Sequence, residues 1–125
     1  MPSRVIHFEI PASNPETVIK FFQDTFGWKI EKYGDQPYWL CNTGNADDMG
    51  INGAIMPREN EHHHVQNTIG VADIEDSRKT IVANGGVLAS EIMDIPKIGK
   101  FCYFKDPDGN IHGIIKPVEM SNNAG

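Results

Sequence analysis

The chain has 125 residues and a mass of 13.9 kDa, a size that suits one ordinary domain with its own hydrophobic core. A hydrophobic share of 39% excludes disorder throughout, and no apolar stretch approaches the roughly 20 residues of a membrane-spanning helix. The net charge of -6, from 11 basic and 17 acidic residues, excludes the basic surface that nucleic-acid binding needs.

These properties predict a soluble, cytoplasmic protein with no membrane or nucleic-acid partner. The first seven residues lack the long apolar core of a signal peptide. Cys41 and Cys102 lie too far apart in sequence for a CxxC motif, so we expect two reduced, buried thiols.

The first predicted strand covers residues 4–10, where side chains alternate with a period of two. One face carries Ile6, Phe8 and Ile10, and the other carries Val5, His7 and Glu9. A helix follows, with two possible starts: a capping box from Ser13 to Glu16, or Asn14 as cap with Pro15 at the first helical position. Gly27 is placed to end this helix, and short strands are expected over residues 28–33, 38–42 and 50–56.

The second half repeats this order. A strand is expected over residues 66–71, followed by a helix that Asp73 caps and Gly85 and Gly86 end. Strands over residues 87–91, 101–105 and 111–116 complete the half. The sequence Asp106-Pro107-Asp108-Gly109 has the composition of a type I turn, which predicts a hairpin between the last two strands.

An internal repeat supports this duplication. Residues 51–57 and 111–117 share the pattern I-x-G-x-I-x-P at a spacing of 60. We therefore expect one domain over residues 1–118, made of two repeats at about residues 3–57 and 64–118, with a flexible tail at 119–125. The run His62-His63-His64 falls in the polar connection and is interpreted as a solvated linker, because alternation along an extended chain points His63 away from its neighbours.

The predicted fold class is α+β. Two βαβββ repeats would form a cupped, partly closed eight-stranded mixed sheet with the helices outside, because one copy alone cannot cover its apolar sheet face. The sheet faces turned away from the helices would then line the cup.

The motifs carry a family resemblance. Phe26-Gly27-Trp28 closes the first helix, and Phe104-Lys105-Asp106-Pro107-Asp108-Gly109-Asn110 precedes the last strand. With the doubled topology, the chain resembles the vicinal oxygen chelate superfamily over roughly residues 3–118. This superfamily includes glyoxalase I, bleomycin-resistance proteins and extradiol dioxygenases. The resemblance implies a homodimer that binds a small-molecule ligand in the cup.

The resemblance also implies four positions for the ligands of a divalent metal, one on the first and one on the last strand of each copy. Matched to this sequence, they are His7, Gly53, Thr68 and Gly113. His7 alone has a good ligating atom, whereas a catalytic zinc site needs about three protein ligands. We therefore predict no metal and no other cofactor.

Candidate catalytic residues are His7 and Glu9, which share a strand face and could form a carboxylate-oriented imidazole. Structural hydrogen bonding by one or both is the alternative. The large aromatic residues of the middle strands either line the cup or pack in the core: Trp28, Tyr38, Trp39, Phe101 and Tyr103. The predicted ligand-binding residues are Val5, Gly53, Gln66, Thr68, Gly113, Trp39 and Tyr103.

Three functions remain open at this point. The first is a glyoxalase-like, metal-independent enzyme or binding protein, related to lactoylglutathione lyase, whose substrate is unknown. The second is a protein of the bleomycin-resistance type that sequesters a toxic or antibiotic compound without turnover. The third is a metal-dependent lyase, isomerase or dioxygenase built from unexpected ligands such as His7 with Glu9.

Overall fold

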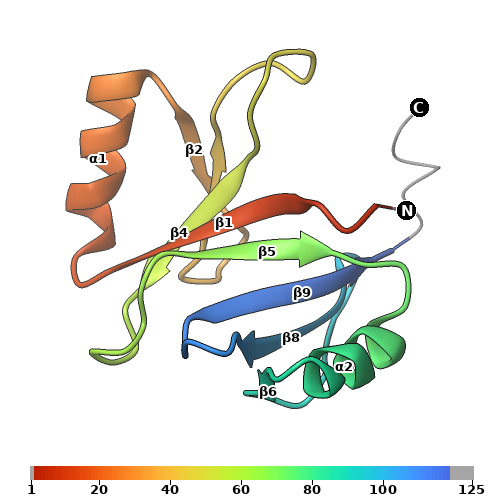
Figure 1. Cartoon of the computed structure of the whole chain (residues 1–125). Coiled ribbons are helices and arrows are strands. Elements are labelled where there is room, and N and C mark those ends of the chain that lie inside the picture. The colour runs from red at the N-terminus through yellow and green to blue at the C-terminus, as the bar shows by residue number, and fades with distance from the viewer. Residues whose placement is uncertain (1, 119–125) are drawn as a thin grey trace. The chain divides into compact units, whose positions relative to one another are not determined.

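The computed structural model describes residues 2–118, so the tail predicted at 119–125 lies outside the described residues. Contacts divide the chain into two units. The N-terminal unit comprises residues 6–67, and the C-terminal unit comprises residues 2–5 with 68–118. Each unit combines one helix with a mixed sheet, which confirms the α+β class and the duplicated order of elements (Figure 1). Residues 2–5 group with the second half because Gly70 N–H donates to the Arg4 carbonyl at 2.8 Å.

The N-terminal unit follows the predicted order closely. Its elements are β1 (Val5–Ala12), α1 (Pro15–Phe26), β2 (Lys29–Lys32), β3 (Trp39–Asn42) and β4 (Gly53–Pro57). The strands lie in the order β2-β3-β4-β1. β1 and β4 are parallel, and the other neighbours are antiparallel.

Local sequence sets both ends of α1. The Asn14 side chain accepts a hydrogen bond from Thr17 N–H at 3.5 Å, and Pro15 takes the first helical turn, so the second of the two predicted starts is the one observed. Gly27 ends the helix at φ 72°, in the left-handed region that side chains disfavour.

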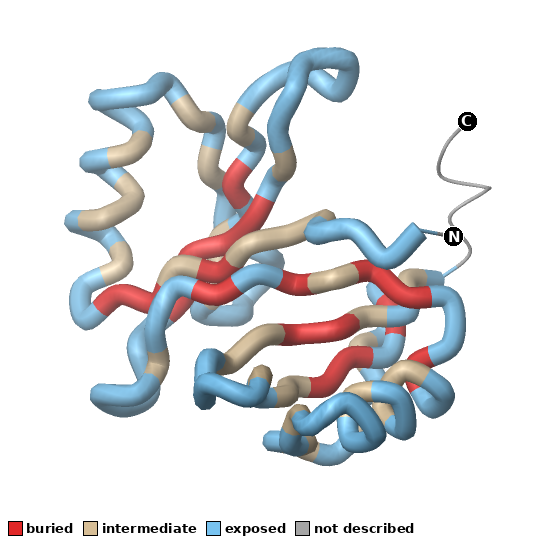
Figure 2. Tube along the Cα trace, in the orientation of Figure 1, coloured by how far each residue is buried: buried red, intermediate tan, exposed pale blue. Residues whose placement is uncertain are grey.

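The hydrophobic core of the N-terminal unit lies between α1 and one face of its sheet. Ala12, Cys41 and Ile55 are its buried centre. The side chains packed around them come from both layers: Phe8, Ile10, Val18, Ile19, Phe22, Trp28, Ile30 and Trp39. Figure 2 shows the buried residues concentrated in the strands, with the outer side of each helix exposed. Phe8 and Ile10 thus face α1, as the alternation predicts.

The C-terminal unit contains one strand more than expected. Its elements are β5 (Gln66–Gly70), α2 (Ile74–Ala83), β6 (Val87–Leu88), β7 (Met93–Ile95), β8 (Gly99–Lys105) and β9 (Ile111–Pro117), although the first two residues of β5 group with the N-terminal unit. The sheet order is β5-β9-β8-β6, and β7 also pairs with β8. A second core cluster joins this sheet to α2 through Val71, Ile74, Cys102 and Ile114.

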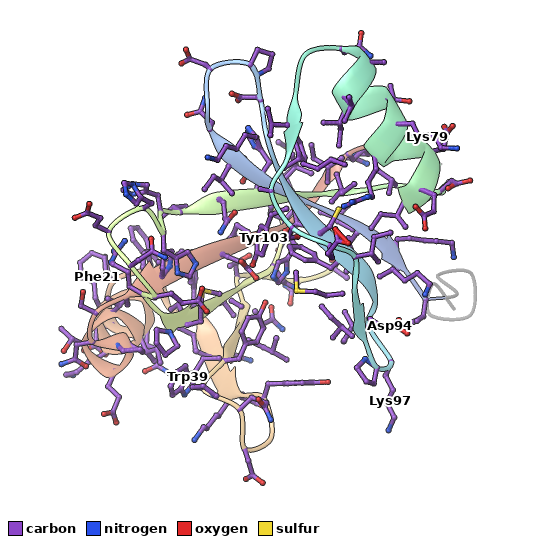
Figure 3. The ribbon with its side chains drawn as sticks, turned by 90° about the horizontal axis from the view of Figure 1, so that it is seen from below. Phe21, Trp39, Lys79, Asp94, Lys97 and Tyr103 are labelled. Carbon is purple, nitrogen blue, oxygen red and sulfur yellow. The ribbon has the colours of Figure 1, made fainter. Side chains whose placement is uncertain are left out.

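The strand predicted over residues 87–91 is shortened to β6, and β7 is an additional strand that follows it. Ala89 N–H still donates to the Tyr103 carbonyl at 3.0 Å, but Tyr103 N–H donates to Ser90 Oγ at 2.9 Å instead of to a backbone carbonyl. A side-chain acceptor therefore ends the ladder at Ser90. β7 and β8 form a hairpin, with Lys97 at its tip and at φ 69° (Figure 3).

The β8–β9 turn is organised by the carboxylate of Asp106. It accepts from the backbone N–H groups of Asp108 at 2.9 Å and Asn110 at 3.0 Å, and from His112 Nε2 at 2.9 Å. The predicted type I turn is closed by Gly109 N–H donating to the Asp106 carbonyl at 2.9 Å. The His112 hydrogen bond, followed by that of Asn110, holds the pKa of Asp106 well below its usual range. Among the described residues, neither helix is long and apolar enough to cross a membrane.

Substituting Asp106→Asn tests this turn by changing how stability depends on pH. A carboxylate whose pKa is depressed by folding stabilises the protein above its ordinary pKa, and that contribution disappears as the pH falls through the folded value. We expect D106N to be less stable than the wild type at pH 7 and to lose less stability on acidification. Urea unfolding between pH 7 and pH 3 measures both, with Asp47→Asn in an exposed loop as the matched control.

Candidate functional site

Two polar residues of β1 lie on the sheet face opposite α1, which we call the His7 face. His7 and Glu9 alternate with Phe8 and Ile10, so the packing of those two residues against α1 places His7 and Glu9 on the other side. The register continues this face across the sheet, because Glu9 pairs with Ala54 and Ala54 pairs with Leu40.

A hydrogen-bonded triad is formed on this face by His7, Tyr38 and Glu9. His7 Nε2 lies 3.1 Å from the Tyr38 hydroxyl, and that hydroxyl donates to Glu9 Oε2 at 3.1 Å. Glu9 is 8% exposed, so the triad ends in a buried carboxyl group. Tyr38 is held at the start of β3 by its carbonyl, which accepts from Tyr33 N–H at 2.8 Å.

Burial decides the protonation state of the imidazole. It lowers the pKa of His7 below the ordinary value of 6.5, because a charged ring is poorly solvated there. His7 is therefore neutral near pH 7, with one ring nitrogen as donor and the other as acceptor. His7 and Glu9 lie together on one strand face, as the alternation predicts, whereas the sequence gives Tyr38 only as an aromatic residue of the cup or the core and not as their hydrogen-bond partner.

Two predicted ligand-binding residues of the N-terminal unit lie on the opposite face from His7. Trp39 pairs with Ile55 and packs in the core beside α1, with the Lys32 ammonium 5.8 Å from its ring centre. Gly53 pairs with Phe8, and a Cβ added to it would lie 2.5 Å from Phe8 Cγ. Both belong to the α1 side because neighbouring strands in register share faces. The prediction that Trp39 and Gly53 lie on the ligand-facing side of the sheet is therefore wrong.

Three predicted residues of the C-terminal unit form a single row across its sheet. Gly113 of β9 pairs with Thr68 of β5 on one side and with Tyr103 of β8 on the other. The row lies on the face away from α2, because the neighbouring residues Ile69, Cys102 and Ile114 belong to the core cluster of that helix. The structure thus brings Thr68, Gly113 and Tyr103 together.

The Phe101 ring covers the glycine of this row. Phe101 is 6% exposed and meets the Tyr103 ring edge to face, with 4.7 Å between ring centres. A Cβ added to Gly113 would lie 2.6 Å from Phe101 Cζ and 3.2 Å from Thr68 Oγ1. Gly113 therefore permits close packing of an aromatic side chain on the sheet. Figure 3 labels Tyr103, the neighbour of this ring.

The two remaining predicted ligand residues differ in exposure. Val5 is 40% exposed at the start of β1. Gln66 is 9% exposed, and in the described part of the chain its Oε1 is a buried side-chain oxygen without a hydrogen-bond partner. Such an acceptor is costly to bury, by about 1–3 kcal/mol, unless a water or a ligand donates to it.

The three histidines of the connecting segment do not gather their ring nitrogens around one point. His63 Nδ1 accepts from Glu59 N–H at 3.2 Å, and the exposed His62 lies 3.5 Å from the Glu61 carboxylate. His112 stacks on Phe104 with 5.3 Å between ring centres, on the α2 side, as its position opposite Gly113 predicts.

The match to a known family decides what kind of protein this is. The family described as Glyoxalase/Bleomycin resistance protein/Dioxygenase superfamily matches residues 4–112. The chain belongs to this superfamily. The resemblance seen in the turn motif and the duplicated order is thereby confirmed.

Related proteins carry glyoxylase-like descriptions. The chain is 32% identical over 117 residues to a "Glyoxylase-like domain-containing protein" of Didymella fabae, covering 85% of this chain and 88% of that protein. It is 29% identical over 113 residues to "Putative glyoxylase CFP32" of Mycobacterium tuberculosis, covering 88% of this chain but only 42% of that protein.

A solved structure shows the shared fold. It is Streptomyces coelicolor methylmalonyl-CoA epimerase in complex with 2-nitronate-propionyl-CoA, and it matches with a TM-score of 0.69 over 95% of this chain and 97% of that chain. At 15% identity this likeness concerns the fold alone.

The residues of this superfamily member do not fit the divalent metal that the family resemblance implies. Within residues 2–118, no three His, Cys, Asp or Glu side chains lie together in a way that could hold a metal ion. Gly113 has no ligating atom and is covered by Phe101, while Gly53 faces the α1 core. We derive no chemical step through a metal.

The packing of Phe101 on Gly113 predicts how adding a methyl group at position 113 changes the stability of the protein. Gly113→Ala forces the ring or the backbone to move, so we expect the free energy of unfolding to fall by about 1–3 kcal/mol. Chemical denaturation measures this, with Gly44→Ala as control because a Cβ added to that exposed glycine would have Asp48 Oδ2 as its neighbour at 4.0 Å, an ordinary contact distance. An unchanged stability in G113A would show that the ring is not tightly packed there.

Proposed function

We propose that this glyoxalase-like protein binds a small organic molecule and that His7 acts on it as an acid–base group without a metal ion. The hydrogen-bonded triad of His7, Tyr38 and Glu9 carries the proposal. A neutral imidazole with one nitrogen hydrogen-bonded toward a carboxyl group is the arrangement by which enzymes orient a histidine for proton transfer. Glu9 is the orienting group at the end of the chain of hydrogen bonds.

The row in the C-terminal unit supports a role in ligand binding. Thr68 and Tyr103 bring hydroxyl groups beside the apolar ring of Phe101, and ligand sites combine apolar surface with a few polar groups. Gln66 offers a buried acceptor that a ligand donor would satisfy. We propose Thr68, Tyr103, Gln66 and Val5 as ligand-binding residues, with Gly113 making room for Phe101.

The class of reaction follows from what an acid–base residue can do unaided. It can move a proton to or from a carbon or heteroatom of the ligand, which is a lyase-like or isomerase-like step. The methylglyoxal–glutathione adduct and methylmalonyl-CoA are suitable probes, because the relatives are described as glyoxylases and a structural neighbour binds a CoA ester. A homodimeric state and a cytoplasmic location are part of the proposal, to be tested by light scattering and cell fractionation.

Binding and turnover of these two probes test the proposal in chelator-treated protein. A probe present at 100 times its Kd raises the free energy of unfolding by about 2.7 kcal/mol. We expect His7→Gln to lower turnover by about 10²- to 10⁴-fold, the usual contribution of one acid–base group. His62→Gln, in the exposed connecting segment, is the matched control and is expected to behave like the wild type.

Two results would contradict this function. A probe that binds but is recovered unchanged would leave a binding protein of the bleomycin-resistance type. Activity that disappears with the chelator and returns with a stoichiometric metal would establish a metal-dependent enzyme instead.

The pH dependence of turnover gives a separate check on His7. Because burial lowers the pKa of His7, its basic form persists as the pH falls through 6.5 and is lost only at more acidic pH. We expect kcat/KM to fall on the acidic side with a midpoint below pH 6.5. A midpoint above pH 6.5 would exclude His7 as the base.

A further inference from the structure

The Tyr38 hydroxyl lies between the two residues proposed to be catalytic and is hydrogen-bonded to both. It is 3.1 Å from His7 Nε2 and 3.1 Å from Glu9 Oε2. A tyrosine hydroxyl has one proton to donate but can also accept. The direction of its hydrogen bond to Glu9 therefore constrains that of its hydrogen bond to His7.

The Tyr38 hydroxyl donates to Glu9 Oε2, so its single proton points to that oxygen. The hydroxyl oxygen then has to accept from His7, and Nε2 has to carry the proton. In a neutral imidazole this leaves a lone pair on Nδ1. The hydrogen bonds therefore run in one direction, from His7 through Tyr38 to Glu9.

We propose that Tyr38 is a positioning residue that fixes His7 as the Nε2–H tautomer and so makes Nδ1 the proton-accepting atom. This inference rests on the proposed function, in which His7 is the acid–base group, and it assigns the reacting nitrogen. It also gives a defined task in the site to Tyr38, which the sequence places only among the aromatic residues of the cup or the core.

The Nδ1 atom is available to a ligand. Its ring makes the hydrogen bond to Tyr38 through the other nitrogen, and in residues 2–118 no hydrogen bond to Nδ1 is present. Among the described residues, Gln66 Oε1 is the side-chain nitrogen or oxygen that is fully buried and has no hydrogen-bond partner. His7 Nδ1 does not fall in this class, so part of its surface is accessible.

The tautomer restricts the chemical class of the ligand. The group that meets Nδ1 has to be a hydrogen-bond donor or a weak acid: a hydroxyl, an amine, or a C–H next to a carbonyl. A carboxylate or phosphate oxygen at this atom would place two lone pairs against each other. The anionic parts of any substrate must therefore bind elsewhere.

Nitrogen NMR of histidine-labelled, full-length protein at pH 7.5 tests the assignment directly. Long-range ¹H–¹⁵N correlation spectra distinguish a protonated from an unprotonated ring nitrogen, and the His7 signals are those that vanish in His7→Gln. We expect the wild type to show a protonated Nε2 and an unprotonated Nδ1. In Tyr38→Phe the fixing hydrogen bond is lost, so the two nitrogen shifts should move toward each other as the tautomers mix.

Tyr33→Phe is the matched control. Tyr33 is 39% exposed, and its contact with Tyr38 is made by backbone atoms, so its hydroxyl can be removed without touching the triad. In the Tyr33→Phe variant, the two ring-nitrogen shifts of His7 should equal those of the wild type. Thermal unfolding of both variants checks that they fold.

The inference is overturned if wild-type His7 is protonated on Nδ1, or if Tyr38→Phe leaves the His7 shifts unchanged. Protonation on Nδ1 would mean that Glu9 is the protonated donor and that the hydrogen bonds run in reverse. If Tyr38→Phe does not fold, the wild-type spectrum alone decides. Because no ligand is needed, failure of this inference is distinguishable from failure of the probes to bind or react.

Discussion

The alternation of side chains along β1 is the constraint on which the site depends. Phe8 and Ile10 pack under α1, and for that reason His7 and Glu9 emerge together on the other face of the same strand. A shift of one residue in this strand would bury the two polar side chains in the core and expose the two apolar ones. The hydrophobic core of the N-terminal unit and its polar triad are thus consequences of a single strand register.

Much of the architecture could be predicted because its signals are local. Period-two alternation, an Asn-Pro helix start, Gly27 and the Asp106–Gly109 turn each act within a few residues, and the structure has each of them where the sequence indicates. The same holds for His7 with Glu9, which lie two apart on one strand. The early end of β6 and the additional strand β7 could not be predicted, because the interruption depends on a hydrogen bond between Ser90 Oγ and Tyr103 N–H, thirteen residues away.

The rest of the candidate site depends on register between strands, which the sequence does not encode locally. Matching the repeats at a spacing of 60 makes Gly53 the equivalent of Gly113. In the structure, however, Gly53 faces α1 through its pairing with Phe8, while Gly113 faces away from α2. Trp39 was misplaced for the same reason. Tyr38 reaches Glu9 from 29 residues along the chain, and no pattern in one sequence identifies that contact.

The Phe101 ring on Gly113 also limits how the chain can change over evolutionary time. An acidic side chain at position 113 would force the Phe101 ring or the backbone to move, and shrinking Phe101 first leaves a gap in a packed row. Neither step is neutral by itself, so the two positions have to change as a pair. An exchange at position 113 alters one residue, but its cost depends on the size of the residue at position 101.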